Sequence, residues 1–388
     1  MCSKKRFVLA QILCLVLFTV SFIATAQQRL KVAVFAPIYL DSAFKGDDYK
    51  LGLNNLPKNM LAGLDFYNGV MMAVDSLQSE DKNLDVLFYD SKGSESIYTI
   101  IRKPEFAGVN MIIAAFNNRQ DIVPLAEIAQ HRNIPLISAT YPNDGGVTNN
   151  PYFVMINSSL KTHVDQIYKY IQKNYSSTHI LYVKRNGQLE DLVQYYFREA
   201  GKASAPPPFV YQTLDLADPF TSQSLLSNLD STSDNTIICG SLNEAFGVKL
   251  VKTLAANGSY NCTVMGMPTW DGLKDLDGSD CNGVNIIFST PYNFVRTQST
   301  AATLAFNYKS QLNGRPSDMF FKGYESMYHF TSLLIKHPKD LINHLSDKEF
   351  KLFNDFNIEP VKNINDQSIQ YLENKKIYFI KKINGITK

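Results

Sequence analysis

The stretch Met111–Thr140, MIIAAFNNRQDIVPLAEIAQHRNIPLISAT, decides the fold that we expect for this chain. Two short apolar runs, Met111–Phe116 and Ile134–Ser138, enclose a segment whose apolar residues recur at helical spacing. Polar residues follow or end each run. The whole arrangement is the pattern of a strand, a helix and a second strand. In open α/β sheets, ligands bind outside the carboxyl ends of the strands. These polar residues are therefore the first place to look for a binding site.

The same alternation of strands and helices continues along most of the chain. Strand-like runs occur at 31–36, 85–90, 111–115, 134–138, 152–156, 179–183, 209–213, 236–239, 262–267 and 284–289. Helical patterns lie between them, and two more follow at 300–312 and 320–336. The alternation predicts an α/β fold with two parallel sheets, each flanked by helices and each with its own core. Near the end, 368–372 and 377–382 are predicted to pair as a hairpin.

The first 26 residues have the pattern of a secretory signal peptide. Lys4–Arg6 is basic, Phe7–Ile23 is apolar, and Ala24-Thr25-Ala26 is a small-residue cleavage site. A retained N-terminal anchor is the alternative. Cys14 follows Leu13 rather than a small residue, which argues against lipidation. No later stretch is long and apolar enough to span a bilayer, so we expect an exported protein.

The remaining composition narrows the class of protein. The formal net charge of +2 gives no indication of a nucleic-acid surface. A length of 388 residues fits two domains, at roughly 100–200 residues each. Cys239 ends an apolar run and is expected to be a buried hydrophobe. Cys262 and Cys281 are either a disulfide pair or two free thiols, and spacing alone does not decide between them.

Several motifs together resemble one family, the type I periplasmic solute-binding proteins, and in particular the branched-chain amino acid receptors of ABC importers. These motifs are Val32–Pro37, Phe66–Val74 with its internal glycine, Asp90, Ile134–Thr140, Gly266-Met267-Pro268, Gly283-Val284 and Tyr324. Their order and spacing over most of the mature chain carry the resemblance. It implies two Rossmann-like lobes, each a parallel sheet flanked by helices, joined by a three-crossing hinge. It also implies a periplasmic location and an ABC permease as partner.

The resemblance also implies where the lobes divide. We expect 1–26 to be the signal peptide, and 27–157 with 291–337 to form the first lobe. Residues 158–290 with 338–388 would form the second lobe and a C-terminal tail. The crossings would fall near 157–158, near 289–290 and within 345–360.

In this family, a small ligand is held between the lobes. The loop Ser138-Ala139-Thr140 would grip the main-chain groups of an amino acid-like ligand, with Tyr39, Asn117 and Asn118 beside it. The alternative for this loop is a strand end whose hydroxyls cap the next turn. From the second lobe we expect Asn243, Trp270 and Asp271, with Asp271 pairing a ligand ammonium. Trp270 would stack on the ligand, guard the cleft, or pack at its rim.

Other kinds of chemistry find little support in the sequence. There is no nucleophile elbow, zinc-protease motif or phosphate-binding glycine loop. None of the six histidines has metal-ligand spacing to another, and Asp271–Asp280 misses the EF-hand pattern and is expected to be a polar loop. We therefore expect no enzyme activity, no cofactor and no metal.

Two departures from the family pattern motivate a second hypothesis. The first loop of the second lobe reads Lys184-Arg185-Asn186-Gly187 where amino acid receptors usually have a tyrosine-glycine pair, and Thr269 and Trp270 intervene before Asp271. The loop Tyr39–Met60 is also long. The chain is thus either a solute receptor or a ligand-free envelope scaffold or sensor that regulates a partner such as a cell-wall synthase.

Overall fold

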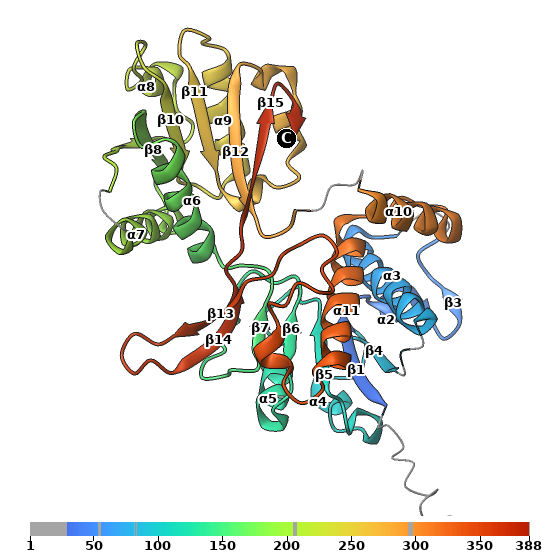
Figure 1. The fold of residues 1–388 in the computed structure, drawn as a ribbon. Helices are drawn as coiled ribbons and strands as arrows, with labels where there is room; N and C mark the ends of the chain where they lie inside the picture. The colour runs from blue at the N-terminus through green and yellow to red at the C-terminus, as the bar shows by residue number, and fades with distance from the viewer. Residues whose placement is uncertain are drawn as a thin grey trace, which may run out of the picture.

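The computed structural model describes residues 29–52, 56–80, 82, 84–204, 208–293 and 298–387; the predicted signal peptide lies outside them. Two seven-stranded sheets organise this part of the chain (Figure 1). The first runs in the order β13-β14-β7-β6-β5-β1-β4 and the second in the order β16-β15-β12-β11-β10-β8-β9. We call the body built on each sheet a lobe. The prediction of a two-lobed α/β fold is confirmed.

The first sheet consists of β1 (Leu30–Ala36), β4 (Leu84–Asp90), β5 (Met111–Ala114), β6 (Leu136–Ser138), β7 (Phe153–Met155), β13 (Ile358–Lys362) and β14 (Ile369–Asn374). The second consists of β8 (His179–Arg185), β9 (Gln212–Leu216), β10 (Asn235–Cys239), β11 (Cys262–Gly266), β12 (Val284–Thr290), β15 (Tyr378–Ile383) and β16 (Ile386–Thr387). Their inner strands pair in parallel, as the alternation with helices requires, whereas β13, β15 and β16 are antiparallel to their neighbours.

Helices cover both faces of each sheet. The first lobe carries α3 (Lys58–Ser79), α4 (Ile97–Ile100), α5 (Ile122–Arg132), α10 (Ser299–Leu312) and α11 (Asp318–Lys336), and the second carries α6 (Leu160–Asn174), α7 (Gln188–Ala203), α8 (Ser222–Leu226) and α9 (Glu244–Ala255). The small elements α2 (Leu40–Ala43), β2 (Phe44–Lys45) and β3 (Asp48–Tyr49) lie in the long loop after β1. Within the described ranges, no helix is long and apolar enough to cross a bilayer.

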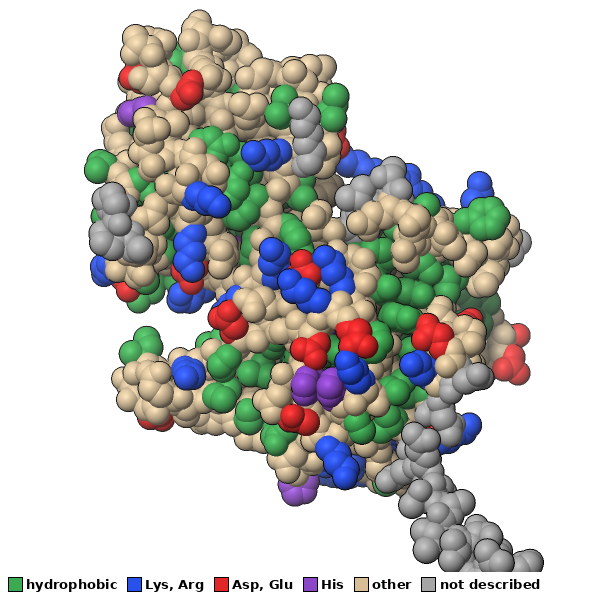
Figure 2. Space-filling model, viewed as in Figure 1, with side chains coloured by type: hydrophobic (Ala, Val, Ile, Leu, Met, Phe, Trp, Pro, Cys, Tyr) green, Lys and Arg blue, Asp and Glu red, His purple; other side chains and the backbone are tan. Residues whose placement is uncertain are grey.

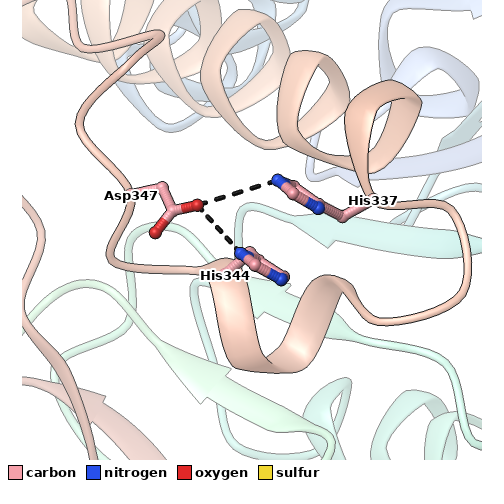
Figure 3. Close-up of side chains that lie close together, drawn as sticks. All are labelled: His337, His344 and Asp347. Carbon is pink, nitrogen blue, oxygen red and sulfur yellow. Dashed lines mark hydrogen bonds and ion pairs between the residues drawn. The ribbon is translucent and has the colours of Figure 1, made fainter.

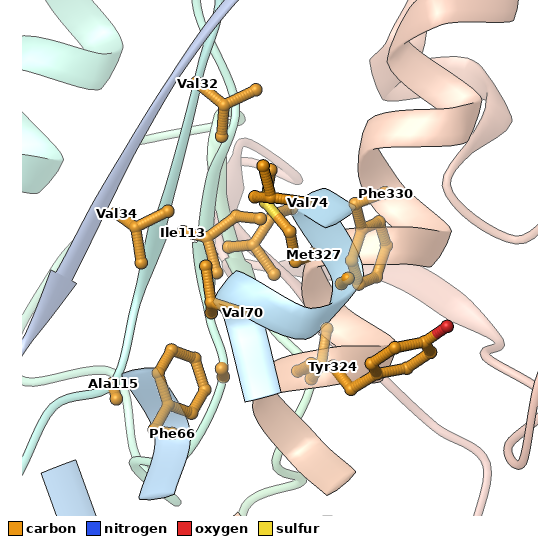
Figure 4. Close-up of a cluster of buried hydrophobic side chains, with 14 of the residues drawn as sticks. Val32, Val34, Phe66, Val70, Val74, Ile113, Ala115, Tyr324, Met327 and Phe330 are labelled. Atoms are coloured by element: carbon orange, nitrogen blue, oxygen red, sulfur yellow. The ribbon is translucent and has the colours of Figure 1, made fainter. Parts of the chain in front are cut away.

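The core of the first lobe is built on one helix pair, α3 and α11, packed against the sheet (Figure 4). Val70 of α3 and Met327 of α11 are fully buried against Ile113 of β5. The two helices approach so closely that a Cβ on Gly69 would lie 2.0 Å from the Phe320 carbonyl oxygen. This contact explains the internal glycine of the motif Phe66–Val74.

The tail of the chain differs from the prediction. Strands β14 and β15 do not form a hairpin, because β14 pairs with β13 and β7 in the first sheet and β15 pairs with β12 in the second. Residues 338–388 thus contribute strands to both sheets. The third crossing between the lobes is 375–377 and not 345–360, while the other two follow β7 and β12. The boundaries at 157 and 290 stay predictions.

The three cysteines of the described residues are free. Cys239, Cys262 and Cys281 are all buried and unbridged, so the disulfide alternative is wrong for this structure. Burial raises the pKa of the Cys262 thiol to about 11 and that of Cys239 to about 12. Both side chains lie in the apolar core of the second lobe, as expected for Cys239.

Candidate functional site

A cleft of about 960 Å³ lies between the carboxyl ends of the two sheets. Figure 2 shows a notch in the surface between α7 and the protruding strands β13 and β14. The walls of the cleft include Tyr196 of α7, Val361 of β13 and Tyr371 of β14. The loop after β12 and the first turn of α11 line another part of the cleft. This is the position in which the α/β sheet rule places a ligand.

Opposite charges face this cleft from the two lobes. Asp271, from the second lobe, and Asp318 and Lys322, from α11 of the first lobe, all line it. The Asp271 carboxylate accepts a hydrogen bond of 2.8 Å from the buried Thr290 hydroxyl. The Lys322 ammonium lies 4.0 Å from the centre of the Tyr292 ring, which is a cation–π contact. The arrangement places a carboxylate of the second lobe and an ammonium of the first lobe in the lining of the same cleft.

The walls of the cleft disfavour the charged forms of Lys322 and Asp271. Desolvation lowers the pKa of Lys322, although Asp271 and Asp318 oppose the shift. Desolvation also raises the pKa of Asp271, against the Thr290 hydrogen bond and the charge of Lys322, even though much of that residue is exposed. A group of opposite charge placed beside either residue would restore its charged form.

A polar network surrounds the crossings at the edge of the cleft. Glu373 accepts hydrogen bonds from the Ser159 amide and the Thr162 hydroxyl, and forms an ion pair with Lys375 at 2.5 Å. Burial alone would raise the pKa of Glu373, but Lys375 and these hydrogen bonds outweigh it and lower that pKa. The Asn374 carbonyl accepts from the Ser158 hydroxyl. The first and third crossings are thus tied to each other.

The predicted gripping loop is largely occupied by contacts within the protein. Ser138 is fully buried, and the Thr140 hydroxyl donates to the Phe116 carbonyl at 2.8 Å. The Ala139 carbonyl accepts from the Tyr292 hydroxyl, and the Thr140 carbonyl accepts from Asn157. The buried Ser138 hydroxyl has no hydrogen-bond partner among the described residues, and none of these contacts caps the next turn, so the role of this loop stays a prediction. None of the three loop residues lines the cleft.

Tyr39, Asn117 and Asn118 form a second polar group at the same sheet edge. Asn117 Nδ2 donates to the Tyr39 hydroxyl at 2.8 Å, and Asn118 contacts both Asn117 and Asp121. Tyr39 adopts a left-handed backbone, with φ of 63°, which is costly for a residue with a Cβ. The Asp90 carboxylate holds this loop by accepting from the amides of Ile38, Tyr39 and Leu40. The structure brings these predicted residues together, outside the cleft.

Of the three site residues predicted in the second lobe, one lines the cleft and two do not. Asp271 lines the cleft, whereas Trp270 is fully buried in the second core and cannot stack on a ligand there. Asn243 caps α9 by accepting from the Phe246 amide at 2.8 Å. The polar loop after Asp271 pairs its carboxylates with lysines, Asp277 with Lys382 and Asp280 with Lys252. Those ion pairs fit the expectation of a surface loop.

The sequence did not predict the cleft-lining residues that lie outside the loops at the strand ends. Lys322 and Asp318 belong to α11, which the sequence marks only as an amphipathic helix. Their spacing of four places both on one face of that helix. Tyr292 follows the second crossing, where the sequence carries no site signal. Among the described residues, the one group of metal-binding type is His337, His344 and Asp347; none of the three lines the cleft.

We compared the chain with known proteins. No family model matches it, and no curated protein matches it. Solved structures do match. A candidate branched-chain amino acid ABC transporter from Rhodospirillum rubrum has 12% identity and a TM-score of 0.67, covering 93% of this chain and 99% of that one. A branched-chain amino acid ABC transporter periplasmic ligand-binding protein from Burkholderia xenovorans has 14% identity and a TM-score of 0.59, covering 93% and 92%.

A third structure contains a ligand. It is the branched-chain amino acid transporter substrate-binding protein of Streptococcus pneumoniae in complex with isoleucine, with 14% identity and a TM-score of 0.51, covering 93% of this chain and 98% of that one. At such low identity these matches show a shared fold. The resemblance to type I periplasmic binding proteins is thus confirmed at the level of the fold.

Proposed function

We propose that this chain is a periplasmic solute-binding protein that holds a small, amino acid-like zwitterion between its lobes for an ABC permease. The observation that carries the proposal is the pair of opposite charges, Asp271 from one lobe and Lys322 from the other, that line one cleft. A ligand carboxylate would pair with Lys322 and a ligand ammonium with Asp271. Each contact would be a charge-assisted hydrogen bond in a partly desolvated space.

The mechanism we propose is closure about the three crossings. Contacts made to both lobes are complete only when the lobes close, so a ligand shifts the population towards the closed form. A micromolar dissociation constant requires about −8 kcal/mol net. No step of this mechanism breaks or forms a covalent bond, so the protein would act as a receptor and not as an enzyme.

The test is a calorimetric and thermal-shift screen of the common amino acids. We expect at least one to raise the melting temperature. Asp271→Asn and Lys322→Met should each weaken its binding by about tenfold to a hundredfold, since each removes one charge-assisted contact of about 1.5–3 kcal/mol. Asp75→Asn and Lys169→Met, which change exposed helix residues outside the cleft lining, are matched controls. Unchanged affinity in both cleft variants would refute the assignment of these residues.

A second candidate function rests on a specific observation. In the loop Ser138–Thr140, the Thr140 hydroxyl bonds to Phe116, and the Ala139 and Thr140 carbonyls accept from Tyr292 and Asn157, which leaves fewer groups for a ligand. That arrangement favours a scaffold or sensor that docks on another envelope protein. A screen in which no amino acid stabilises the chain, together with one envelope protein that co-purifies in fixed ratio, would favour the scaffold over the receptor.

A further inference from the structure

Two histidines and an aspartate converge where α11 ends, away from the interlobe cleft (Figure 3). His344 Nδ1 lies 2.9 Å from Asp347 Oδ2, and His337 Nε2 lies 3.7 Å from the same oxygen. The two imidazole rings stack with centroids 3.5 Å apart and planes 3° apart. The three ligand atoms all lie within 4.8 Å of one another.

One of these atoms has no hydrogen bond. His337 Nε2 is buried, and no partner lies within hydrogen-bond range among the described residues. A buried ring nitrogen without a partner is costly. His337 Nε2 and His344 Nδ1 both face the same Asp347 oxygen, and a single ion among the three atoms would satisfy His337 Nε2 once the rings rotate out of their parallel stack.

The backbone around the cluster is held in place before any ion binds. The His337 amide closes α11 by donating to the Leu333 carbonyl at 2.8 Å, and the Asp347 amide donates to the His344 carbonyl at 3.0 Å. Leu341 and Leu345, within the turn that carries His344, are buried in the first core. Ligands on a fixed backbone need only side-chain rotation to converge.

An outer carboxylate completes the arrangement. Asp340 Oδ2 lies 3.7 Å from His344 Nε2, the ring nitrogen that faces away from Asp347, and Asn343 holds the other Asp340 oxygen at 2.6 Å. Histidines that bind metals usually donate their second ring nitrogen to such a carboxylate. At 3.7 Å this carboxylate is beyond hydrogen-bond distance, but it lies on the side of His344 where an outer partner would be needed.

The geometry points to a site for one divalent transition-metal ion of the zinc class, bound by His337 Nε2, His344 Nδ1 and Asp347 Oδ2. Two imidazoles and a carboxylate suit this class better than Ca²⁺ or Mg²⁺, which prefer oxygen ligands. Zinc bonds of about 2.0–2.2 Å set tetrahedral ligands about 3.4 Å apart. The widest separation must then close by about 1.4 Å. Water would complete the coordination. The proposal departs from the expectation of no metal, and the proposed site is independent of the proposed ligand cleft.

The test titrates Zn²⁺ into the mature chain, freed of any affinity tag, in competition with a chromophoric chelator. We expect one equivalent to bind. His337→Gln, His344→Gln and Asp347→Asn should each abolish measurable competition. Asp340→Asn should weaken binding by roughly 10–100-fold, as loss of an outer partner does. His131→Gln changes an exposed histidine outside the cluster and serves as the control.

Co²⁺ provides a second readout, because its visible spectrum reports coordination geometry directly, and circular dichroism of each variant shows whether a lost spectrum reflects lost folding. We expect a tetrahedral spectrum in the wild type and in His131→Gln, and its loss in His344→Gln. Wild-type affinity equal to that of a His337→Gln/His344→Gln double variant would overturn the proposal, as would loss of the site in His131→Gln. Binding of amino acids should be the same with and without Zn²⁺, so failure of either proposal leaves the other standing.

Discussion

In each lobe, a charged residue of the cleft is next in sequence to a residue that takes part in a close packing contact involving glycine. The two packing contacts differ in kind. In the first lobe, Lys322 precedes Gly323, where a Cβ would lie 2.3 Å from the Phe66 carbonyl oxygen of α3. In the second lobe, Asp271 follows Trp270, whose indole ring lies against Gly247 and Gly266. The contact in the first lobe is between two backbones, and the contact in the second lobe is between a backbone and a side chain.

The difference teaches how each charge can be disturbed. A backbone carbonyl cannot be trimmed by substitution, so a clash with it can be relieved only by separating two helices. A ring can be exchanged for a smaller one. The first lobe should therefore hold its cleft charge rigidly, and the second should tolerate paired changes.

The largest effect is expected for Gly323→Ala. Its methyl group would force α11 away from α3, at a cost of about 3 kcal/mol or more in the free energy of unfolding. Urea denaturation measures this loss. Gly258→Ala, at a site where a Cβ would meet nothing within 4 Å, is the control and should change stability by less than about 0.5 kcal/mol. A mild Gly323→Ala would show that the helix contact can yield.

The next effect is a dependence of the free energy of unfolding on pH, which differs in direction between the two lobes. Burial raises the pKa of Glu325 on α11 to about 7, although it accepts from the amides of Phe353 and Asn354. A carboxyl with a raised native pKa binds its proton more tightly when folded, so its contribution to stability falls as pH rises from about 4.5 to about 7. The loss should reach about 3 kcal/mol, at about 1.4 kcal/mol for each pKa unit of the shift. Chemical denaturation of wild type and Glu325→Gln between pH 5 and 8 measures the difference in slope.

Glu190 of the second lobe should respond in the opposite direction. Burial would raise its pKa, but hydrogen bonds of 2.7 Å from Arg185 and Ser241 outweigh burial and lower it. Its contribution to stability is complete above about pH 4.5 and is lost as pH falls further. Equal slopes for Glu325→Gln and wild type would contradict this contrast between the lobes.

A smaller effect is expected for Gly266→Ala, whose Cβ would lie 2.1 Å from the Trp270 ring. We expect a loss of about 2 kcal/mol. Adding Trp270→Phe should recover about 1 kcal/mol, because the smaller ring vacates the space, and a double-mutant cycle measures this coupling. The matched pair Gly323→Ala and Phe66→Leu should show no recovery, since the clash there is with the Phe66 backbone.

The smallest effect is expected for Tyr39→Phe in the first lobe. It removes the hydroxyl that accepts from Asn117 in an exposed setting, so stability should change by less than about 0.5 kcal/mol. Ligand affinity is the more informative measurement. A loss of binding comparable to that of Asp271→Asn would move the site from the cleft towards the rim of the first lobe.

Much of the fold could be predicted because it depends on local patterns. Apolar runs such as Val284–Ser289 gave strands within a residue or two of their observed bounds. The tail could not be predicted, because β14 and β15 each pair with strands more than 80 residues away, and nothing local selects those partners. In the candidate site, Asp271 could be proposed from the sequence because it follows a strand end. Lys322 could not, because its proposed role depends on how α11 lies against the other lobe.

The distribution of the last strands over both sheets has a consequence for the order of assembly. Until β14 arrives, β7 has an open edge, and until β15 arrives, so does β12. A nascent chain, emerging from its amino end, can complete neither sheet before β14 and β15 have been synthesised, long after β7 and β12. Two bare apolar edges exposed for that time invite pairing with other chains. The protein should therefore depend on holdase chaperones during biogenesis more than a protein whose sheets close early.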